Sequence, residues 1–313
     1  MQTRTLGTTG LEISKVVFGG NVFGWTLDPT ESFEMLDACF DKGVTTIDTA
    51  DVYSRWKPGN SGGESETLIG DWLSARPGKR DKVQIFTKVG MDMGGDNKGL
   101  SPRWIREAVE NSLSRLKTDY IDLYFSHKFD PDTPHEETLG VYKDLIDEGK
   151  IRAIGASNFD DNQLDDAMKV AQKNDLPAYQ VLQPEYSLVS RGEFEGPLQR
   201  YCMDHNIGIV TYFSLASGFL TGKYRSKDDL KGASRGGMVE KYLETGMNVL
   251  EALESVAERK NAKMAEVAIA WLLHRDGVTA PIASATKSSH LDSLVKAAEL
   301  SLTQEDMEAL EVY

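Results

Sequence analysis

Short hydrophobic runs and longer amphipathic stretches alternate along almost the whole chain. The short runs are rich in valine, isoleucine and aromatic residues, which favour β-strands, and the amphipathic stretches repeat apolar residues with a helical period. Strands are predicted at residues 16–20, 44–48, 83–87, 120–125, 151–156, 179–183, 207–212 and 279–282. Helices are predicted at residues 29–41, 65–74, 102–116, 135–147, 161–172, 196–204, 249–259, 263–274 and 289–298.

Strands that alternate with helices in this way are typically parallel and joined by crossover connections. Two architectures fit the pattern, a closed eight-stranded barrel and an open doubly wound sheet. An open sheet that binds a dinucleotide would carry G-x-G-x-x-G after its first strand, and VVFGGNVFGW at residues 16–25 does not match that motif. The sequence therefore favours an α/β fold, a (β/α)8 TIM barrel, as a single domain over residues 1–313.

Two further segments complete the predicted architecture. RTLGTTGLEISKV, at residues 4–16, places a Gly-Thr-Thr-Gly turn between two short β-like runs, which predicts an N-terminal β-hairpin that closes the lower end of the barrel. From residue 213 to about residue 246 no strand period appears, and irregular segments of that length are usually functional. We expect this segment to be a long loop on the face that holds the carboxyl ends of the strands.

Composition mainly excludes classes of function. Of the 313 residues 40% are hydrophobic and 27% charged, as in ordinary globular proteins. The formal net charge of −14 argues against a nucleic-acid or anionic-membrane surface, although a local basic group can still bind a small anion. No signal peptide, long apolar run or cysteine pattern is recognisable, so we expect a cytoplasmic protein without a metal site. No apolar stripe predicts a particular oligomeric state.

Candidate catalytic residues stand at the ends of the predicted strands, where barrels of this type carry their active sites. The second strand ends at Asp48 in IDTADVY, with Tyr53 five residues further on. The third strand ends at Lys88 and the fourth at His127. Each side chain taken singly could be structural, but together they place an acid, an amine, an imidazole and a phenol on one rim.

Elementary electrostatics indicates how these four groups would cooperate. A phenol with a pKa of about 10 is a poor acid at neutral pH, and a nearby ammonium group lowers that pKa by stabilising the phenolate. We therefore expect Lys88 to make Tyr53 a general acid, and Asp48 to keep Lys88 charged in a site of low dielectric. His127 would hold a substrate carbonyl in position through a hydrogen bond.

These residues and their segments resemble the aldo-keto reductase family, in its bacterial, NADPH-dependent form. IDTADVY, the lysine that ends the third strand and the histidine of DLYFSH match the family's catalytic tetrad, and the resemblance runs from residue 6 to residue 297. It implies an oxidoreductase that reduces a small aldehyde or ketone with hydride from NADP(H). The implied catalytic residues are Asp48, Tyr53, Lys88 and His127, with no metal.

The same resemblance implies which residues bind the cofactor. Ser157, Asn158 and Gln183 match the positions that hold the nicotinamide carboxamide, and Tyr212 matches the aromatic residue under the nicotinamide ring. Relatives usually have Ser-Pro-Leu after that aromatic residue, whereas this chain has Phe-Ser-Leu at residues 213–215. The full predicted set is Gly20, Asn21, Val22, Asp48, Ser157, Asn158, Gln183, Tyr212, Phe213, Ser214, Leu215, Ser217, Gly218, Leu220, Lys223, Ser284, Thr286, Lys287 and His290.

The cofactor's phosphates are expected near the eighth strand, where Ser284, Thr286 and Lys287 precede a helix whose N-terminal amides attract anions. Relatives that prefer the 2′-phosphorylated cofactor commonly have a basic residue near Lys287, so NADPH is expected over NADH. A solvated surface role is the alternative for this lysine. His290 and Ser293 stand where relatives often have Gln and Asn against the adenine.

Aromatic side chains in the expected rim loops predict an apolar mouth around the substrate carbonyl. The loop SRWKPGNSGGESE, at residues 54–66, should shape its entrance. Packing in the core is the alternative role for each aromatic residue. The predicted substrate residues are Phe23, Trp25, Tyr53, Trp56, His127 and Phe129.

Two functions of different classes are compatible with these residues. The first is a carbonyl reductase in which Tyr53 protonates the alkoxide that forms on reduction. The second is a cofactor-binding regulatory subunit with slow or no turnover, like the channel β-subunits of this fold, which can retain the tetrad. A barrel hydrolase with Asp48 as its acid would leave Lys88 and the carboxamide-binding set unexplained.

Overall fold

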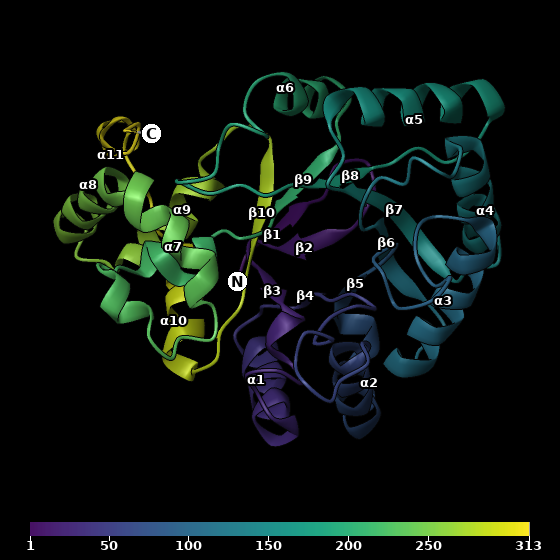
Figure 1. Ribbon diagram of the computed structural model, residues 1–313, viewed down its shortest axis with the longest axis horizontal. Helices are drawn as coiled ribbons and strands as arrows, with labels where there is room; N and C mark the ends of the chain where they lie inside the picture. Colours follow the sequence, from purple (N-terminus) through teal and green to yellow (C-terminus); the bar gives the residue numbers. More distant parts are fainter. Residues whose placement is uncertain (313) are drawn as a thin grey trace.

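The computed structural model describes residues 1–312; Tyr313, the last residue of the predicted domain, lies outside the described residues. A closed barrel of parallel strands is surrounded by helices (Figure 1). Around the barrel the strands follow the order β10, β3, β4, β5, β6, β7, β8 and β9. Each strand pairs with the next one along the chain and the last closes on the first, which confirms the predicted (β/α)8 barrel.

The barrel strands coincide with the eight predicted ones to within a few residues at each end. Strands of a parallel barrel are buried on both faces, so they read in the sequence as continuous apolar runs. The strands are β3 (Val17–Gly19), β4 (Thr46–Asp48), β5 (Gln84–Val89), β6 (Ile121–Ser126), β7 (Ile151–Ser157), β8 (Val181–Gln183), β9 (Gly208–Thr211) and β10 (Val278–Ala283).

Helices cover the outside of the barrel, and several of them begin at side chains that cap the free amides. Asp28 and Asp160 each form a capping box, and Ser101 accepts from the amide of Trp104. The helices of the first part are α1 (Pro29–Asp41), α2 (Glu64–Ala75), α3 (Pro102–Leu116), α4 (His135–Asp147), α5 (Asp161–Asn174) and α6 (Pro197–Asp204). Short 3-10 turns occur at η1 (Gly20–Val22) and η2 (Arg80–Lys82).

The last third of the chain forms a group of helices on one side of the barrel (Figure 1). They are α7 (Gly236–Thr245), α8 (Met247–Arg259), α9 (Met264–Leu273), α10 (Ser288–Ala297) and α11 (Gln304–Ala309). Helix α7 and the 3-10 turns η3 (Ala216–Thr221) and η4 (Lys227–Leu230) lie in the segment predicted as a long loop. That prediction missed α7 because its first two residues are glycines, which disfavour helix. Among residues 1–312, no helix is long and apolar enough to span a membrane.

An N-terminal hairpin closes the end of the barrel opposite the predicted active-site rim. Strand β1 (Thr3–Thr5) pairs antiparallel with β2 (Glu12–Ser14), as predicted. Leu6 and Ile13 are fully buried in the apolar cluster that fills the barrel. Arg4 donates to the carbonyl oxygen of Val278, at the start of β10. The hairpin therefore seals one end, and a ligand can approach the barrel only from the other.

The interior of the barrel is a packed apolar core, which keeps the polar groups at the rim. The cluster includes Val17, Phe86, Leu123, Phe125 and Val210 from four different strands. Strand β7 makes room for one of these rings with a glycine, since a Cβ atom on Gly155 would lie 2.4 Å from the Phe125 ring.

Gly155→Ala tests whether this close approach sets the stability of the barrel. We expect the free energy of unfolding to fall by about 1–3 kcal/mol, because the added methyl group overpacks the core. The matched control is Gly140→Ala in α4, where a Cβ atom would meet nothing within 4 Å and should add about 0.5–1 kcal/mol. Urea denaturation measures both, and equal stability of the two variants would contradict the packing argument.

Candidate active site

Three of the four predicted catalytic side chains lie in direct hydrogen-bonding contact on one rim of the barrel. Strands β4 and β5 are neighbours, with Asp48 opposite Phe86 in the ladder, so Lys88 stands just beyond Asp48 at the same end. The Lys88 ammonium lies 2.7 Å from the Asp48 carboxylate and 2.9 Å from the Tyr53 hydroxyl oxygen. The structure therefore brings these three predicted residues into contact.

Lys88 is held by a complete set of acceptors. Its side chain is 0% exposed, and Nζ donates to Asp48 Oδ2, to the carbonyl oxygen of Thr49 at 2.8 Å and to Tyr53. An ammonium group has three N–H donors and no acceptor, so every donor is used. Burial lowers the pKa of Lys88, and the charge and hydrogen bond of Asp48 act in the opposite direction. Asp48 is thus the group that contributes most to keeping Lys88 charged.

The expectation that Lys88 lowers the pKa of Tyr53 is wrong for this arrangement. Burial raises the pKa of Tyr53 well above its ordinary value, and the charge of Asp48 and the hydrogen bond to it add to the increase. The Tyr53 hydroxyl donates to Asp48 Oδ2 at 3.1 Å while its oxygen accepts from Lys88. The phenol is therefore firmly protonated, and its proton faces Asp48.

His127 follows β6 and lies beside the same group. Its ring centroid is 6.2 Å from that of Tyr53, and its Nδ1 atom is buried with no hydrogen-bond partner among the described residues. Burial lowers the pKa of His127 well below its usual value, and the charge of Lys88 contributes to the decrease. The imidazole is therefore neutral, and its one N–H can donate to an oxygen atom in the site.

A second charged layer behind the tetrad was not predicted. Glu66 of α2 is buried and accepts from Arg115 at 2.7 Å and from the Thr87 hydroxyl at 2.6 Å. Asp51, three residues after Asp48, is 1% exposed, and within residues 1–312 no side chain donates a hydrogen bond to either carboxylate oxygen. Burial raises the pKa of Asp51, and the charge of Glu66 adds to the increase. The signal in the sequence was a second acid within IDTADVY.

The residues predicted to hold the nicotinamide carboxamide lie together next to the tetrad. Gln183 Nε2 donates to Asp48 Oδ1 at 2.9 Å, and the Ser157 hydroxyl donates to the Gln183 carbonyl oxygen at 2.8 Å. The Asn158 amide donates to the His127 carbonyl oxygen and accepts from the Tyr212 hydroxyl at 2.7 Å. Amide donors and acceptors are thus fixed beside the catalytic group, and the hydrogen bond holds the Tyr212 ring in place.

The segment after Tyr212 has an unusual backbone. Phe213, Ala216, Ser217 and Gly218 all have φ between +47° and +97°. Successive left-handed residues turn backbone amides toward one side, which is a geometry that suits anions. The Ser214 hydroxyl donates to the Thr211 carbonyl oxygen at 3.1 Å, so it stabilises the turn where relatives have proline. In this segment Leu220 is buried, Leu215 is half-buried and Lys223 is exposed.

The loop after β3 contributes predicted cofactor-binding residues on the other side of Asp48. A Cβ atom on Gly20 would lie 2.9 Å from the Asp48 carbonyl oxygen, so only glycine fits there. The Asn21 amide lies 2.6 Å from the Ser284 hydroxyl, and with its nitrogen toward Ser284 its oxygen accepts from Arg235 at 3.3 Å. Arg235, which the sequence did not single out, thus links the segment before α7 to this loop. The Val22 side chain is buried, so only its backbone can face a ligand.

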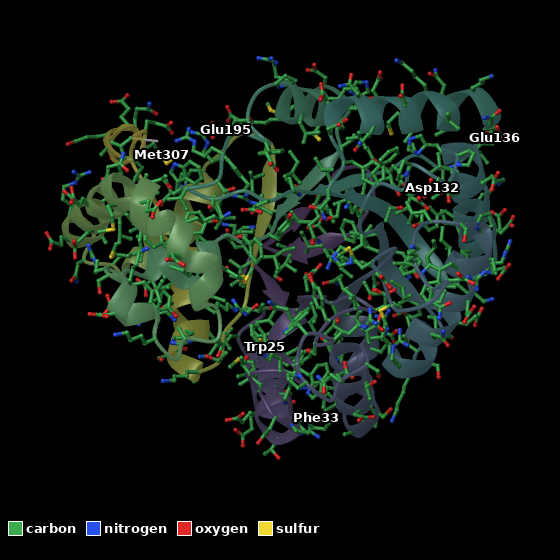
Figure 2. The ribbon with its side chains drawn as sticks, viewed as in Figure 1. Trp25, Phe33, Asp132, Glu136, Glu195 and Met307 are labelled. Carbon is green, nitrogen blue, oxygen red and sulfur yellow. The ribbon has the colours of Figure 1, made fainter. Side chains whose placement is uncertain are left out.

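Three predicted aromatic residues form a row that ends at the tetrad. The Trp25 ring lies 5.5 Å from Trp56, and Trp56 lies 5.9 Å from Tyr53, between ring centroids. Trp25 also carries the Arg235 guanidinium 5.0 Å from its ring and faces the group of helices that includes α7 and α10 (Figure 2). Trp56 is 48% exposed and lies at the entrance.

Of the other predicted substrate residues, Phe23 lies in the core, and the role of Phe129 stays a prediction. Phe23 is fully buried and stacks on Phe18 with ring centroids 5.5 Å apart, so it belongs to the core and not to the mouth. Its burial follows from the short turn η1, which directs the chain back onto the barrel. Phe129 is half-buried and packs against His135 and Phe159, beside α4.

Known proteins resemble this chain over nearly its full length. The family model described as the aldo/keto reductase family matches residues 15–312. The aldo-keto reductase YhdN of Bacillus subtilis (strain 168) is 34% identical, over 98% of this chain and 91% of its own. The uncharacterized oxidoreductase YrpG of the same organism is 33% identical, over 99% of this chain and 95% of its own. A probable voltage-gated potassium channel subunit beta of Oryza sativa subsp. japonica is 33% identical, over 96% of this chain and 92% of its own.

Asp51→Asn tests the electrostatic position of the unpartnered acid. Folding raises the pKa of Asp51, so the folded protein still holds a proton on this carboxyl at a pH above about 4, where the unfolded chain has lost it. The free energy of unfolding of wild type therefore falls as the pH rises above that value. The variant lacks this loss. We expect it to gain about 1–3 kcal/mol relative to wild type between about pH 4 and pH 8.

Urea denaturation across this range measures the difference, and Asp132→Asn, at an exposed acid, is the control. If Asp51→Asn loses stability relative to wild type as the pH rises, then Asp51 is an ionised partner of a cation and the assignment is wrong.

Proposed function

The chain belongs to the aldo/keto reductase family, and from this premise we propose that it is a cytoplasmic, NADPH-dependent reductase of a small aldehyde or ketone. Tyr53 is the general acid, assisted by Lys88, Asp48 and His127. The observation that carries the proposal is the buried Lys88 ammonium, which holds the Asp48 carboxylate at 2.7 Å and the Tyr53 hydroxyl oxygen at 2.9 Å.

The chemistry that the nicotinamide cofactor supplies when bound is hydride for the carbonyl carbon. As the carbonyl oxygen gains negative charge, the Tyr53 hydroxyl turns from Asp48 toward it and gives up its proton, which yields the alcohol. Lys88 stabilises the phenolate that remains, because its N–H already points at that oxygen. The N–H of the neutral His127 ring orients the same carbonyl oxygen. Solvent then returns a proton to Tyr53.

The raised pKa of Tyr53 fits this role. An acid that must give its proton to a forming alkoxide has to be protonated when the substrate binds, and burial ensures this. Since the alkoxide of a simple alcohol is a far stronger base than a phenolate, the transfer is downhill once reduction begins. The charge on Lys88 is needed at that moment, because the phenolate forms next to Asp48 and would otherwise face a second anion.

The residues around the rim support a nicotinamide cofactor. Ser157, Asn158 and Gln183 present amide and hydroxyl groups beside the tetrad, as a carboxamide requires. The left-handed turn from Ala216 to Gly218 would direct backbone amides at a diphosphate. Lys223 and Lys287 are exposed and have no acidic partner in the part of the chain that is described, which supports the 2′-phosphorylated form.

A cofactor-binding regulatory subunit is the second candidate. The relative from Oryza sativa that is named a probable channel subunit is as similar to this chain as the relatives named oxidoreductases. Both classes would bind the cofactor, so binding alone does not separate them. Turnover does, because a regulatory subunit would bind NADPH tightly and reduce carbonyl compounds slowly or not at all.

Tyr53→Phe is the direct test of the general acid. We expect turnover of 4-nitrobenzaldehyde, followed by NADPH absorbance, to fall about 10²–10⁴-fold, the usual contribution of a positioned acid. NADPH binding, followed by fluorescence, should remain within about twofold, since the variant keeps the ring. Tyr201→Phe in α6, whose hydroxyl donates to Asp165, is the control and should leave turnover unchanged.

Turnover and NADPH binding together distinguish the two candidate functions. Rapid turnover by wild type that Tyr53→Phe removes supports the reductase. Tight NADPH binding by wild type without turnover of 4-nitrobenzaldehyde and several ketones supports the regulatory subunit. Full turnover by Tyr53→Phe would show that another group is the acid, and the assignment of the tetrad would be wrong.

A further inference from the structure

The residue that follows Tyr53 has a backbone conformation that favours glycine. Ser54 has a φ of +72°, in the left-handed region, which is sterically unfavourable for a residue with a Cβ atom. It is fully buried, and the bend that it makes sets the direction in which the loop after β4 leaves Tyr53. Such a conformation persists only when the surrounding contacts hold it in place. The contacts that hold Ser54 therefore also hold the backbone next to the phenol.

The Ser54 hydroxyl is anchored to the core of the protein. It donates to the carbonyl oxygen of Phe23 at 2.6 Å. Phe23 is fully buried, and its ring stacks on Phe18 of β3 with centroids 5.5 Å apart. Because close packing in the core fixes Phe23, this hydrogen bond ties the chain next to Tyr53 to a rigid part of the fold.

Asn60 makes a second connection between the same two loops. Its Nδ2 atom donates to the carbonyl oxygen of Ser54 at 2.9 Å and to that of Gly24 at 3.1 Å. A side-chain amide nitrogen has two N–H donors, so both are used. Gly24 directly precedes Trp25. The half-buried Asn60 side chain therefore joins the loop after β3 to the loop after β4.

These three hydrogen bonds act at the place where Tyr53 needs support. In the structure the Tyr53 hydroxyl is held by Asp48 and Lys88. When the hydroxyl turns from Asp48 toward a carbonyl oxygen, as the proposed reaction requires, the bond with Lys88 is the one that stays. The position of the ring then depends on the backbone of residues 53–60, and an error of about 1 Å in such a position can slow a reaction about 100-fold.

We propose that Ser54 and Asn60 are positioning residues for the general acid. Together they tie the loop that carries Tyr53 to the loop that carries Trp25, so that the phenol keeps its place when its proton leaves Asp48. The proposal rests on the proposed function and adds to it two residues that act through Tyr53.

Ser54→Gly removes the hydroxyl and keeps the backbone conformation, because glycine adopts a positive φ without strain. We expect hydride transfer from NADPH to 4-nitrobenzaldehyde, followed by absorbance in a single turnover, to slow by about 10–100-fold. NADPH affinity, measured by fluorescence, should stay within about threefold, since neither side chain is among the predicted cofactor contacts. Asn60→Ala, at a half-buried position, should slow the same step by a similar factor.

Ser14→Ala is the matched control. Ser14 is equally buried at the end of β2, and its hydroxyl donates to the carbonyl oxygen of Val16 at 2.8 Å, at the hairpin end of the barrel. Losing this bond should lower the midpoint of urea denaturation and leave the rate of hydride transfer unchanged. The proposal is wrong if either Ser54→Gly or Asn60→Ala transfers hydride at the wild-type rate, or if Ser14→Ala slows the step as much as they do.

The mobility of the Tyr53 ring can be measured without turnover. In protein with ¹³C-labelled tyrosine rings, the Tyr53 signal is assigned from its loss in Tyr53→Phe. Relaxation dispersion should show microsecond-to-millisecond exchange of this signal in Ser54→Gly and Asn60→Ala, and none in wild type or Ser14→Ala.

The two measurements separate this inference from the proposed function. If wild type reduces carbonyl compounds, the rate of hydride transfer decides, and unchanged rates in the variants remove this inference and leave the reductase intact. If wild type reduces none, the reductase is contradicted and the Tyr53 signal decides: exchange in both variants keeps the positioning role, and its absence removes that role as well.

Discussion

The ion pair between Asp48 and Lys88 is the interaction on which the rest of the site depends. Both side chains are almost fully buried, and removing two charges from water costs more than their attraction returns unless further hydrogen bonds satisfy them. Here the barrel supplies those bonds, because the adjacent strands β4 and β5 present the two groups side by side and the Thr49 carbonyl oxygen takes the second donor. The third donor is left for Tyr53. The main effect of the ion pair is therefore to position one N–H of Lys88 against Tyr53, and not to stabilise the fold.

The two ends of the rim handle charge in opposite ways. At the catalytic end every donor of Lys88 has an acceptor within the protein, and the second layer behind it pairs Glu66 with Arg115. At the α10 end Lys223 and Lys287 have no acidic partner in the described segments, although the chain as a whole is acidic. A local positive region attracts a small anion, while the acidic surface around it repels large polyanions. An extended ligand with a neutral reactive end and an anionic far end would match both.

Strand positions, and the meeting of Asp48 and Lys88 at one rim, were predictable because both follow from the fold class. Parallel barrel strands are continuous apolar runs, and the polar residues just after them must meet at one rim. What depends on the packing of distant segments was not predictable. Glycines 236 and 237 concealed α7, Phe23 turned inward, and Lys263 contacts Ser293 only because α9 packs on α10. The direction of the Tyr53 pKa was missed because the sequence shows which groups are near but not how deeply they are buried or where the phenol proton points.

The protonation state of Lys88 tests most directly whether Asp48 keeps this lysine charged beside Tyr53. Protein labelled with ¹⁵N-lysine, with the Lys88 signal assigned from its loss in Lys88→Met, allows Nζ to be titrated by NMR in wild type and in Asp48→Asn. We expect an ammonium signal for Lys88 in wild type at pH 7 and a lower Lys88 pKa in Asp48→Asn, because the carboxylate favours the charged form. A neutral amine in wild type at pH 7, or a Lys88 pKa that Asp48→Asn leaves unchanged, would contradict this role of Asp48.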